Sequence, residues 1–131
     1  MISDESTQRL ARLRLIVVED SFPVADGLKY LLQTVGCDVV GMAGSVRTAL
    51  DLVATTPFDL ALLDIDLHGE HVAPVAEAVR RRGKPVIFLS GYGDEEVLPP
   101  DLRTLPRLEK PVDPDELLAV IARELGTTPT G

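Results

Sequence analysis

The stretch Leu60-Ala61-Leu62-Leu63-Asp64 ends a continuous apolar run in a carboxylate, and it predicts a buried strand with a polar side chain at its end. Such runs are typical of parallel strands that are covered on both faces. Open α/β sheets bind ligands outside the carboxyl ends of their strands, so we expect the polar ends of several such runs to share one rim. The other runs are Leu15–Val18 before Glu19 and Asp20, Val86–Leu89 before Ser90, and the weaker Leu105–Leu108 before Glu109, Lys110 and Pro111.

Helical patterns alternate with the apolar runs. Apolar residues at helical spacing, with serine, proline and glycine near the ends, mark each helix. The predicted strands are residues 14–18, 38–43, 58–63, 85–89 and 105–109. The predicted helices are residues 24–35, a helix that begins after Ser45 and stops near Pro57, residues 74–82 and residues 113–125. This alternation predicts a five-stranded parallel sheet with helices on both faces.

Three segments fit the alternation less well. Pro99, Pro100 and Pro106 leave room for only about one or two helical turns in residues 94–106. Residues 64–73 are expected to form a long loop. We assign residues 1–13 to an N-terminal extension outside the core and residues 126–131 to a disordered tail, which leaves 14–125 as one domain.

Composition excludes several classes of function. The chain has 131 residues, with 13 Lys and Arg against 21 Asp and Glu, and this net charge of -8 argues against nucleic-acid binding. No run is long enough to span a membrane and no signal peptide is visible, so we expect a soluble, cytoplasmic protein. The single cysteine, Cys37, excludes an internal disulfide and is expected to be a small buried hydrophobe.

The acidic residues of the rim indicate metal-assisted phosphate chemistry. Three carboxylates, from Glu19, Asp20 and Asp64, would repel one another without a cation, and an oxygen-only cluster suits Mg²⁺. Such a metal neutralises phosphate oxygens while a carboxylate attacks phosphorus, which gives an acyl phosphate. Lys110 can hold another phosphate oxygen, and Ser90 can donate to the same group.

Four features follow one another along the chain: the acidic pair Glu19-Asp20, Asp64, Ser90 and Lys110-Pro111. This ordered set resembles the receiver domain of bacterial response regulators over residues 14–125. The resemblance implies a flavodoxin-like, doubly wound, three-layer α/β/α fold with strand order 2-1-3-4-5 and a short fourth helix. It implies that Asp64 is phosphorylated by a phosphohistidine of a sensor histidine kinase and that Ser90 and Lys110 contact the phosphoryl group. It further implies Mg²⁺ bound by Glu19, Asp20, Asp64 and the backbone carbonyl of Asp66, and a cis Lys110-Pro111 bond.

The chain departs from the usual receiver pattern on the output side. Arg107 stands where receivers carry a switch tyrosine or phenylalanine, and Tyr92 is a candidate replacement. Ser90-Gly91-Tyr92-Gly93 and the prolines after it resemble an alphaproteobacterial subgroup with a Phe-Ala-Thr-Gly motif, which is associated with HWE-type kinases. The short fourth helix leaves the usual dimer face, and so the oligomeric state, open.

Several functions remain as hypotheses. The first is a single-domain response regulator, not an enzyme, that signals to an unknown downstream protein or acts as a phosphate sink. The alternatives are a receiver-like binding module without phosphorylation and a phosphatase of the haloacid dehalogenase type, whose Asp-x-Asp motif Asp64-Ile65-Asp66 imitates. We interpret His68 and His71 as solvated loop residues rather than as metal or pH-sensing groups.

Overall fold

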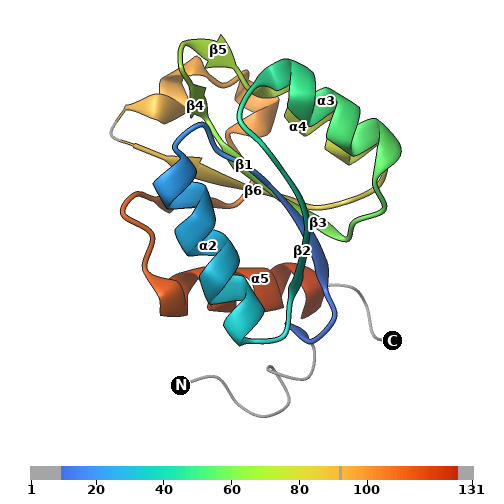
Figure 1. Ribbon diagram of the computed structural model, residues 1–131. Coiled ribbons are helices and arrows are strands. Elements are labelled where there is room, and N and C mark those ends of the chain that lie inside the picture. Colours follow the sequence, from blue (N-terminus) through green and yellow to red (C-terminus); the bar gives the residue numbers. More distant parts are fainter. Residues whose placement is uncertain (1–9, 92, 127–131) are drawn as a thin grey trace.

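A five-stranded parallel sheet forms the centre of the molecule (Figure 1). The computed structural model describes residues 10–91 and 93–126. The strands lie in the order β2-β1-β3-β6-β7, and each neighbouring pair is parallel. This is the predicted order 2-1-3-4-5, with β6 and β7 as the fourth and fifth strands of the sheet. The strands are β1 (Arg14–Val18), β2 (Asp38–Ala43), β3 (Leu60–Asp64), β6 (Val86–Ser90) and β7 (Arg107–Glu109).

Within the described residues, four α-helices cover the two faces of the sheet, and helices on both faces were predicted. In Figure 1, α2 (Phe22–Thr34) and α5 (Pro114–Gly126) lie on one face, and α3 (Val46–Thr55) and α4 (Ala73–Arg81) lie on the other. Successive residues of the buried strand β3 serve alternate faces: Leu62 packs with the first pair of helices, and Ala61 and Leu63 pack with the second. The two apolar cores are therefore separated by the sheet.

The bounds of β1 and β2 are the predicted ones, and those of β3, β6 and β7 differ from the predicted ones by one or two residues. Residues 58–63 were expected as a strand, but β3 begins at Leu60 and includes Asp64. Asp59 instead pairs with Arg14, whose backbone N–H and guanidinium both donate to its carboxylate, at 2.8 Å for the backbone bond. These hydrogen bonds lower the pKa of Asp59. Phe58 is still buried, which is why its apolar side chain extended the predicted run.

A β-hairpin occupies the segment that was expected to be a loop. Strands β4 (Asp66–Leu67) and β5 (Glu70–His71) pair antiparallel between β3 and α4. His68 and Gly69 connect them with φ of 52° and 81°, the positive values that a tight two-residue hairpin turn of type I′ requires. The expectation of a plain loop over residues 64–73 is therefore wrong.

The start of the described chain belongs to the core, contrary to expectation. Leu10 is fully buried and Leu13 nearly so, and both pack in the cluster with α2 and α5. The buried thiol of Cys37 donates to the carbonyl of Leu10 at a distance of 3.3 Å, which confirms the expected burial of this cysteine. Residues 1–9 and 127–131, including most of the expected tail, lie outside the described residues, and Gly126 ends α5.

The proline-rich segment forms two short 3-10 turns, η1 (Asp94–Val97) and η2 (Pro100–Leu102), as the proline content predicts. Buried Leu98 and Leu102 anchor it to the core of α3 and α4. Tyr92, the candidate replacement for the switch aromatic, lies outside the described residues. Among the described residues, no helix has the length and hydropathy of a membrane-spanning segment.

Candidate functional site

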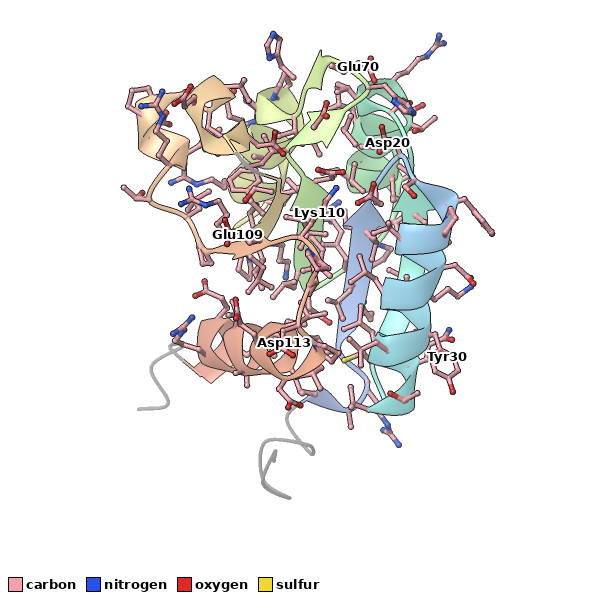
Figure 2. The ribbon with its side chains drawn as sticks, turned by 90° about the vertical axis from the view of Figure 1, so that its left-hand side faces the viewer. Asp20, Tyr30, Glu70, Glu109, Lys110 and Asp113 are labelled. Carbon is pink, nitrogen blue, oxygen red and sulfur yellow. The ribbon has the colours of Figure 1, made fainter. Side chains whose placement is uncertain are left out.

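The polar residues predicted from the strand ends meet at one edge of the sheet. Glu19 follows β1 directly, Asp64 and Ser90 are the last residues of β3 and β6, and Lys110 follows β7. Figure 2 shows Asp20 and Lys110 at this edge, where β1 and β3 end. A parallel sheet produces this arrangement because all of its strands end on the same side.

Three carboxylates of the rim are close enough to share a cation. Oxygen atoms of Glu19, Asp20 and Asp64 lie within 4.8 Å of one another. Glu19 and Asp64 are buried, at 4% and 0% exposure. Burial makes unpaired negative charge costly, so a cluster of this kind requires positive charge beside it.

Lys110 supplies part of this positive charge. Its Nζ lies 2.5 Å from Oδ2 of Asp64 and 3.1 Å from Oε1 of Glu19. Burial alone would lower the pKa of Lys110, but the contacts with Asp64 and Glu19 outweigh burial and raise it. The Lys110-Pro111 bond is cis, as the resemblance implied, and the backbone N–H of Lys110 donates to the carbonyl of Ser90 at 2.8 Å. Lys110 is therefore a fixed ammonium in contact with the buried carboxylate of Asp64.

Backbone N–H groups hold the carboxylates from the other side. The N–H of Asp66 donates to Oδ1 of Asp64 at 3.0 Å, so both oxygens of Asp64 are engaged. The N–H of Ser21 donates to Oε2 of Glu19, also at 3.0 Å. Ser21 occupies the N-cap of α2, but its own side chain makes no capping bond. The start of α2 is thus hydrogen-bonded to the side chain of Glu19. Metal binding by the backbone carbonyl of Asp66 stays a prediction.

Two buried polar atoms at the rim have no hydrogen-bond partner among the described residues. They are Oγ of Ser90 and Oε1 of Glu19, and the second of these still has the ammonium of Lys110 at 3.1 Å. Native structures leave few such atoms unpaired, so each requires an explanation. A carboxylate oxygen suits a hard cation such as Mg²⁺, and a hydroxyl can donate to an anionic oxygen. The residues present therefore fit Mg²⁺ and a phosphoryl group.

His68 makes a contact with the site that was not expected for a solvated loop residue. Its side chain is largely exposed, as predicted, but its Nδ1 lies 3.0 Å from Oδ2 of Asp20. The hairpin turn produces this contact, and neither the His-Gly pair nor its apolar neighbours predict where the imidazole points. His71 is exposed in the same hairpin, and Arg107 is exposed at the start of β7.

Comparison with known protein families and curated proteins agrees with the site. The model of the response regulator receiver domain matches residues 15–122. The transcriptional regulatory protein DltR of Streptococcus agalactiae is 35% identical over 113 residues, which are 83% of this chain and 50% of DltR. The sensory transduction protein LytT of Bacillus subtilis is 27% identical over 108 residues, which are 80% of this chain and 45% of LytT. The chain thus spans about half the length of these relatives.

Solved structures give the same result. SdrG from Sphingomonas melonis Fr1 has 32% identity and a TM-score of 0.77, with 87% of this chain and 97% of SdrG covered. The response regulator PhyR from Brucella abortus has 28% identity and a TM-score of 0.79, with 94% of this chain and 51% of PhyR covered. These matches favour the receiver over the phosphatase alternative, and they include receivers of alphaproteobacteria, as the fourth-strand motif indicated. The chain belongs to the response regulator receiver domain family of two-component systems.

Proposed function

We propose that Asp64 accepts a phosphoryl group from a phosphohistidine of a sensor histidine kinase, in a reaction that depends on Mg²⁺. Receiver domains of two-component systems are phosphorylated by sensor histidine kinases. The observation that carries the assignment to Asp64 is its place in the rim. Asp64 is a buried carboxylate with an oxygen within 4.8 Å of carboxylate oxygens of Glu19 and Asp20, and its Oδ2 lies 2.5 Å from Nζ of Lys110.

Glu19, Asp20 and Asp64, with the carbonyl of Asp66, would hold the magnesium ion. The ion would neutralise phosphoryl oxygens as negative charge gathers at the acidic rim. The close grouping of the three carboxylates supports this assignment, because Lys110 contacts only Glu19 and Asp64 among them and one ammonium does not balance three negative charges. His68 contacts Asp20, and this contact adds no positive charge beside the two buried carboxylates, Glu19 and Asp64.

The chain's own residues supply the rest of the transfer. A carboxylate oxygen of Asp64 forms a bond to phosphorus while the N–P bond of the phosphohistidine breaks and the donor imidazole keeps the electron pair. The product is an acyl phosphate on Asp64. Lys110 is placed to keep its ammonium on a phosphoryl oxygen, and the unpartnered hydroxyl of Ser90 is placed to donate to another.

The proposed phosphoryl donor is a kinase of the HWE type. The phosphorylated surface would then be recognised by a second protein, or this domain would act as a phosphate sink for a shared kinase. The resemblance of Ser90-Gly91-Tyr92-Gly93 to the alphaproteobacterial fourth-strand motif supports the kinase type. Phe22, at the rim end of α2, and Tyr30, near its other end, are 70% and 73% exposed, and large exposed apolar side chains support a protein partner that contacts α2. In Figure 2, Tyr30 stands out from α2. Arg107 in place of the switch aromatic implies a readout that does not use a rotating ring there.

Phosphorylation by acetyl phosphate tests the acceptor directly. With Mg²⁺, the wild-type protein should gain one phosphoryl group by intact mass spectrometry, and both Asp64→Asn and removal of Mg²⁺ by chelation should abolish the gain. Asp66→Asn is the matched control, because it removes a nearby carboxylate but keeps the Oδ1 atom that accepts from Gly69. Phosphoryl label that persists in Asp64→Asn would disprove the acceptor. Fast hydrolysis of a small phosphate ester would favour a phosphatase instead.

A further inference from the structure

The backbone N–H of Gly91, directly after β6, faces the end of β3. The backbone groups of a central strand point alternately toward its two neighbours. In β6 the carbonyl of Leu89 accepts from the N–H of Ile65 at 2.9 Å, on the β3 side. The carbonyl of Ser90 accepts from the N–H of Lys110 at 2.8 Å, on the β7 side. The N–H of Gly91 comes next in this alternation, so it points to the β3 side, where the acceptor strand ends.

The carboxylate of Asp94, the first residue of η1, occupies this N–H. Oδ2 of Asp94 accepts from the N–H of Gly91 at 2.6 Å, and the N–H of Asp94 donates back to the carbonyl of Gly91 at 3.2 Å. A hydrogen bond to an ionised carboxylate is stronger than one between neutral groups. Glycine permits the close approach, because a Cβ atom at Gly91 would lie only 3.2 Å from Oδ2 of Asp94. The carboxylate therefore holds η1 against the end of β6.

Asp94 also lies beside the residues that follow the acceptor. It lines a cavity of about 270 Å³ with Ile65 and Asp66, the two residues after Asp64. The cavity lies between the β4–β5 hairpin and η1, and Val97 of η1, which is 54% exposed, lines it too. Figure 1 shows the hairpin and the orange 3-10 turns at the same end of the sheet. A phosphoryl group on Asp64 would bring about two negative charges to this end.

We propose that Asp94 is an internal anion that competes with the phosphoryl group for the N–H of Gly91, and that phosphorylation of Asp64 releases it. The unpartnered hydroxyl of Ser90 and the N–H of Gly91 are consecutive donors at the end of β6, and both suit the oxygens of one anion. Two anions at this N–H repel each other. Release of Asp94 frees η1 with its exposed Val97, a surface that a partner protein can recognise. The inference rests on the proposed function, because it requires a phosphoryl group on Asp64.

Three substitutions isolate the competing carboxylate. Asp94→Ala removes both its charge and its hydrogen-bond acceptor. Asp94→Asn removes the charge but keeps Oδ1 as a neutral, weaker acceptor. Glu96→Ala is the matched control, because Glu96 is an exposed acidic residue of the same 3-10 turn. This control keeps the backbone carbonyl of Glu96, which accepts from the guanidinium of Arg103.

The measurement is the dissociation constant for beryllofluoride, a phosphoryl analogue that binds a carboxylate oxygen, by NMR titration with Mg²⁺ and excess fluoride. The wild-type protein must break the bond between Asp94 and Gly91 to bind the analogue, so Asp94→Ala should bind it about tenfold more tightly. Asp94→Asn should tighten binding less, and Glu96→Ala should stay within about twofold of the wild type, because salt screens an exposed charge. In unliganded Asp94→Ala the amide proton of Gly91 should move upfield, because its bond to a carboxylate is lost.

The wild-type protein separates failure of this inference from failure of the proposed function. If it binds beryllofluoride but Asp94→Ala binds no more tightly, the competition is disproved and the acceptor role of Asp64 stands. Equal tightening in Asp94→Ala and Glu96→Ala would likewise contradict it, because any lost negative charge would then have the same effect. If Asp94→Ala does not keep the wild-type NMR spectrum away from η1, Asp94→Asn gives the same comparison with a smaller expected change. If the wild-type protein neither binds beryllofluoride nor gains a phosphoryl group from acetyl phosphate, both the acceptor assignment and the role of Asp94 fail.

Discussion

Lys110 supplies a positive charge to the rim at neutral pH. Its contacts with Asp64 and Glu19 outweigh burial and raise the pKa of the ammonium. A group whose pKa is raised by folding stabilises the native state below its ordinary pKa, about 10.4 for lysine, and loses this contribution as the pH rises through the raised value. The contribution of Lys110 to stability is therefore fully present near pH 7, where phosphoryl transfer would occur.

Cys37 gives a prediction about pH and reactivity. Burial raises the pKa of its thiol from 9.0 to about 11. The native state therefore holds the thiol proton more tightly than the unfolded state, which stabilises the protein below the ordinary pKa and ceases to do so as the pH rises toward 11. Only the thiolate reacts with alkylating reagents, so at a pH of about 8 the native thiol should react at least about a hundredfold more slowly than the unfolded one.

The measurement is the rate of iodoacetamide labelling in buffer and in guanidinium chloride. A native rate equal to the unfolded rate would contradict the burial of Cys37 between Leu10 and the start of β2. Labelling above pH 11 serves as the control, because the difference in thiolate fraction then disappears and only access to the buried sulfur still slows the native reaction.

Single residues differed in how far their roles could be predicted. Glu19, Asp64, Ser90 and Lys110 were placed at one rim from the sequence because each follows or ends an apolar run, and parallel topology brings such ends together. The contact of His68 could not be predicted, because it depends on the direction in which one tight turn points a side chain. The periodicity of apolar residues carries no information about the direction of a side chain in a turn.

The N-caps of α2 and α3 differ, and this difference gives a prediction about stability. Ser45 and Ser21 both occupy N-cap positions, but only Ser45 accepts a side-chain bond, from the N–H of Thr48 at 3.2 Å, in a reciprocal capping box. Ser45→Ala should lower the free energy of unfolding by about 1 kcal/mol, whereas Ser21→Ala should change it by less than about 0.5 kcal/mol.

Urea denaturation of both variants measures this difference. Ser45→Asp should stay close to the wild type, because aspartate also accepts from the backbone of the first helical turn. Equal losses for Ser45→Ala and Ser21→Ala would contradict the capping geometry and would indicate that hydroxyl removal itself is the cause.

Elements with a long periodic pattern were predicted well, and short ones were not. Strand β2 and the helices α2 to α5 follow apolar periodicity over several turns or residues, and their bounds agree with the predicted ones within about two residues. The hairpin strands β4 and β5 have two residues each, too few to show alternation. The start of β3 shows the other limit, since the strand begins at Leu60 although the run that predicted it began at Phe58.

Over the whole molecule, the two apolar cores are closed by different parts of the chain. The core of α3 and α4 is closed at one side by the 3-10 turns, through Leu98 and Leu102. The core of α2 and α5 is closed at the bottom of the sheet by the segment before β1. The N–H of Arg12 donates to the carbonyl of Gly36 at 2.8 Å, so this segment is also hydrogen-bonded to the end of α2. The sequence did not predict this role, because two leucines, Leu10 and Leu13, are too few to show a helical or strand pattern.

Leu10 tests whether this segment is part of the folded unit. It is fully buried in the core of α2 and α5. Leu10→Ala should therefore lower the free energy of unfolding by about 2–5 kcal/mol, whereas Leu10→Met, which keeps most of the volume, should cost less than about 1.5 kcal/mol. Val97 is 54% exposed, so Val97→Ala should cost no more than about 0.5 kcal/mol and serves as the exposed control. Urea denaturation followed by circular dichroism measures all three. A loss for Leu10→Ala as small as that for Val97→Ala would mean that the segment before β1 packs on the core without stabilising it, and the domain would then begin at β1 as the sequence had indicated.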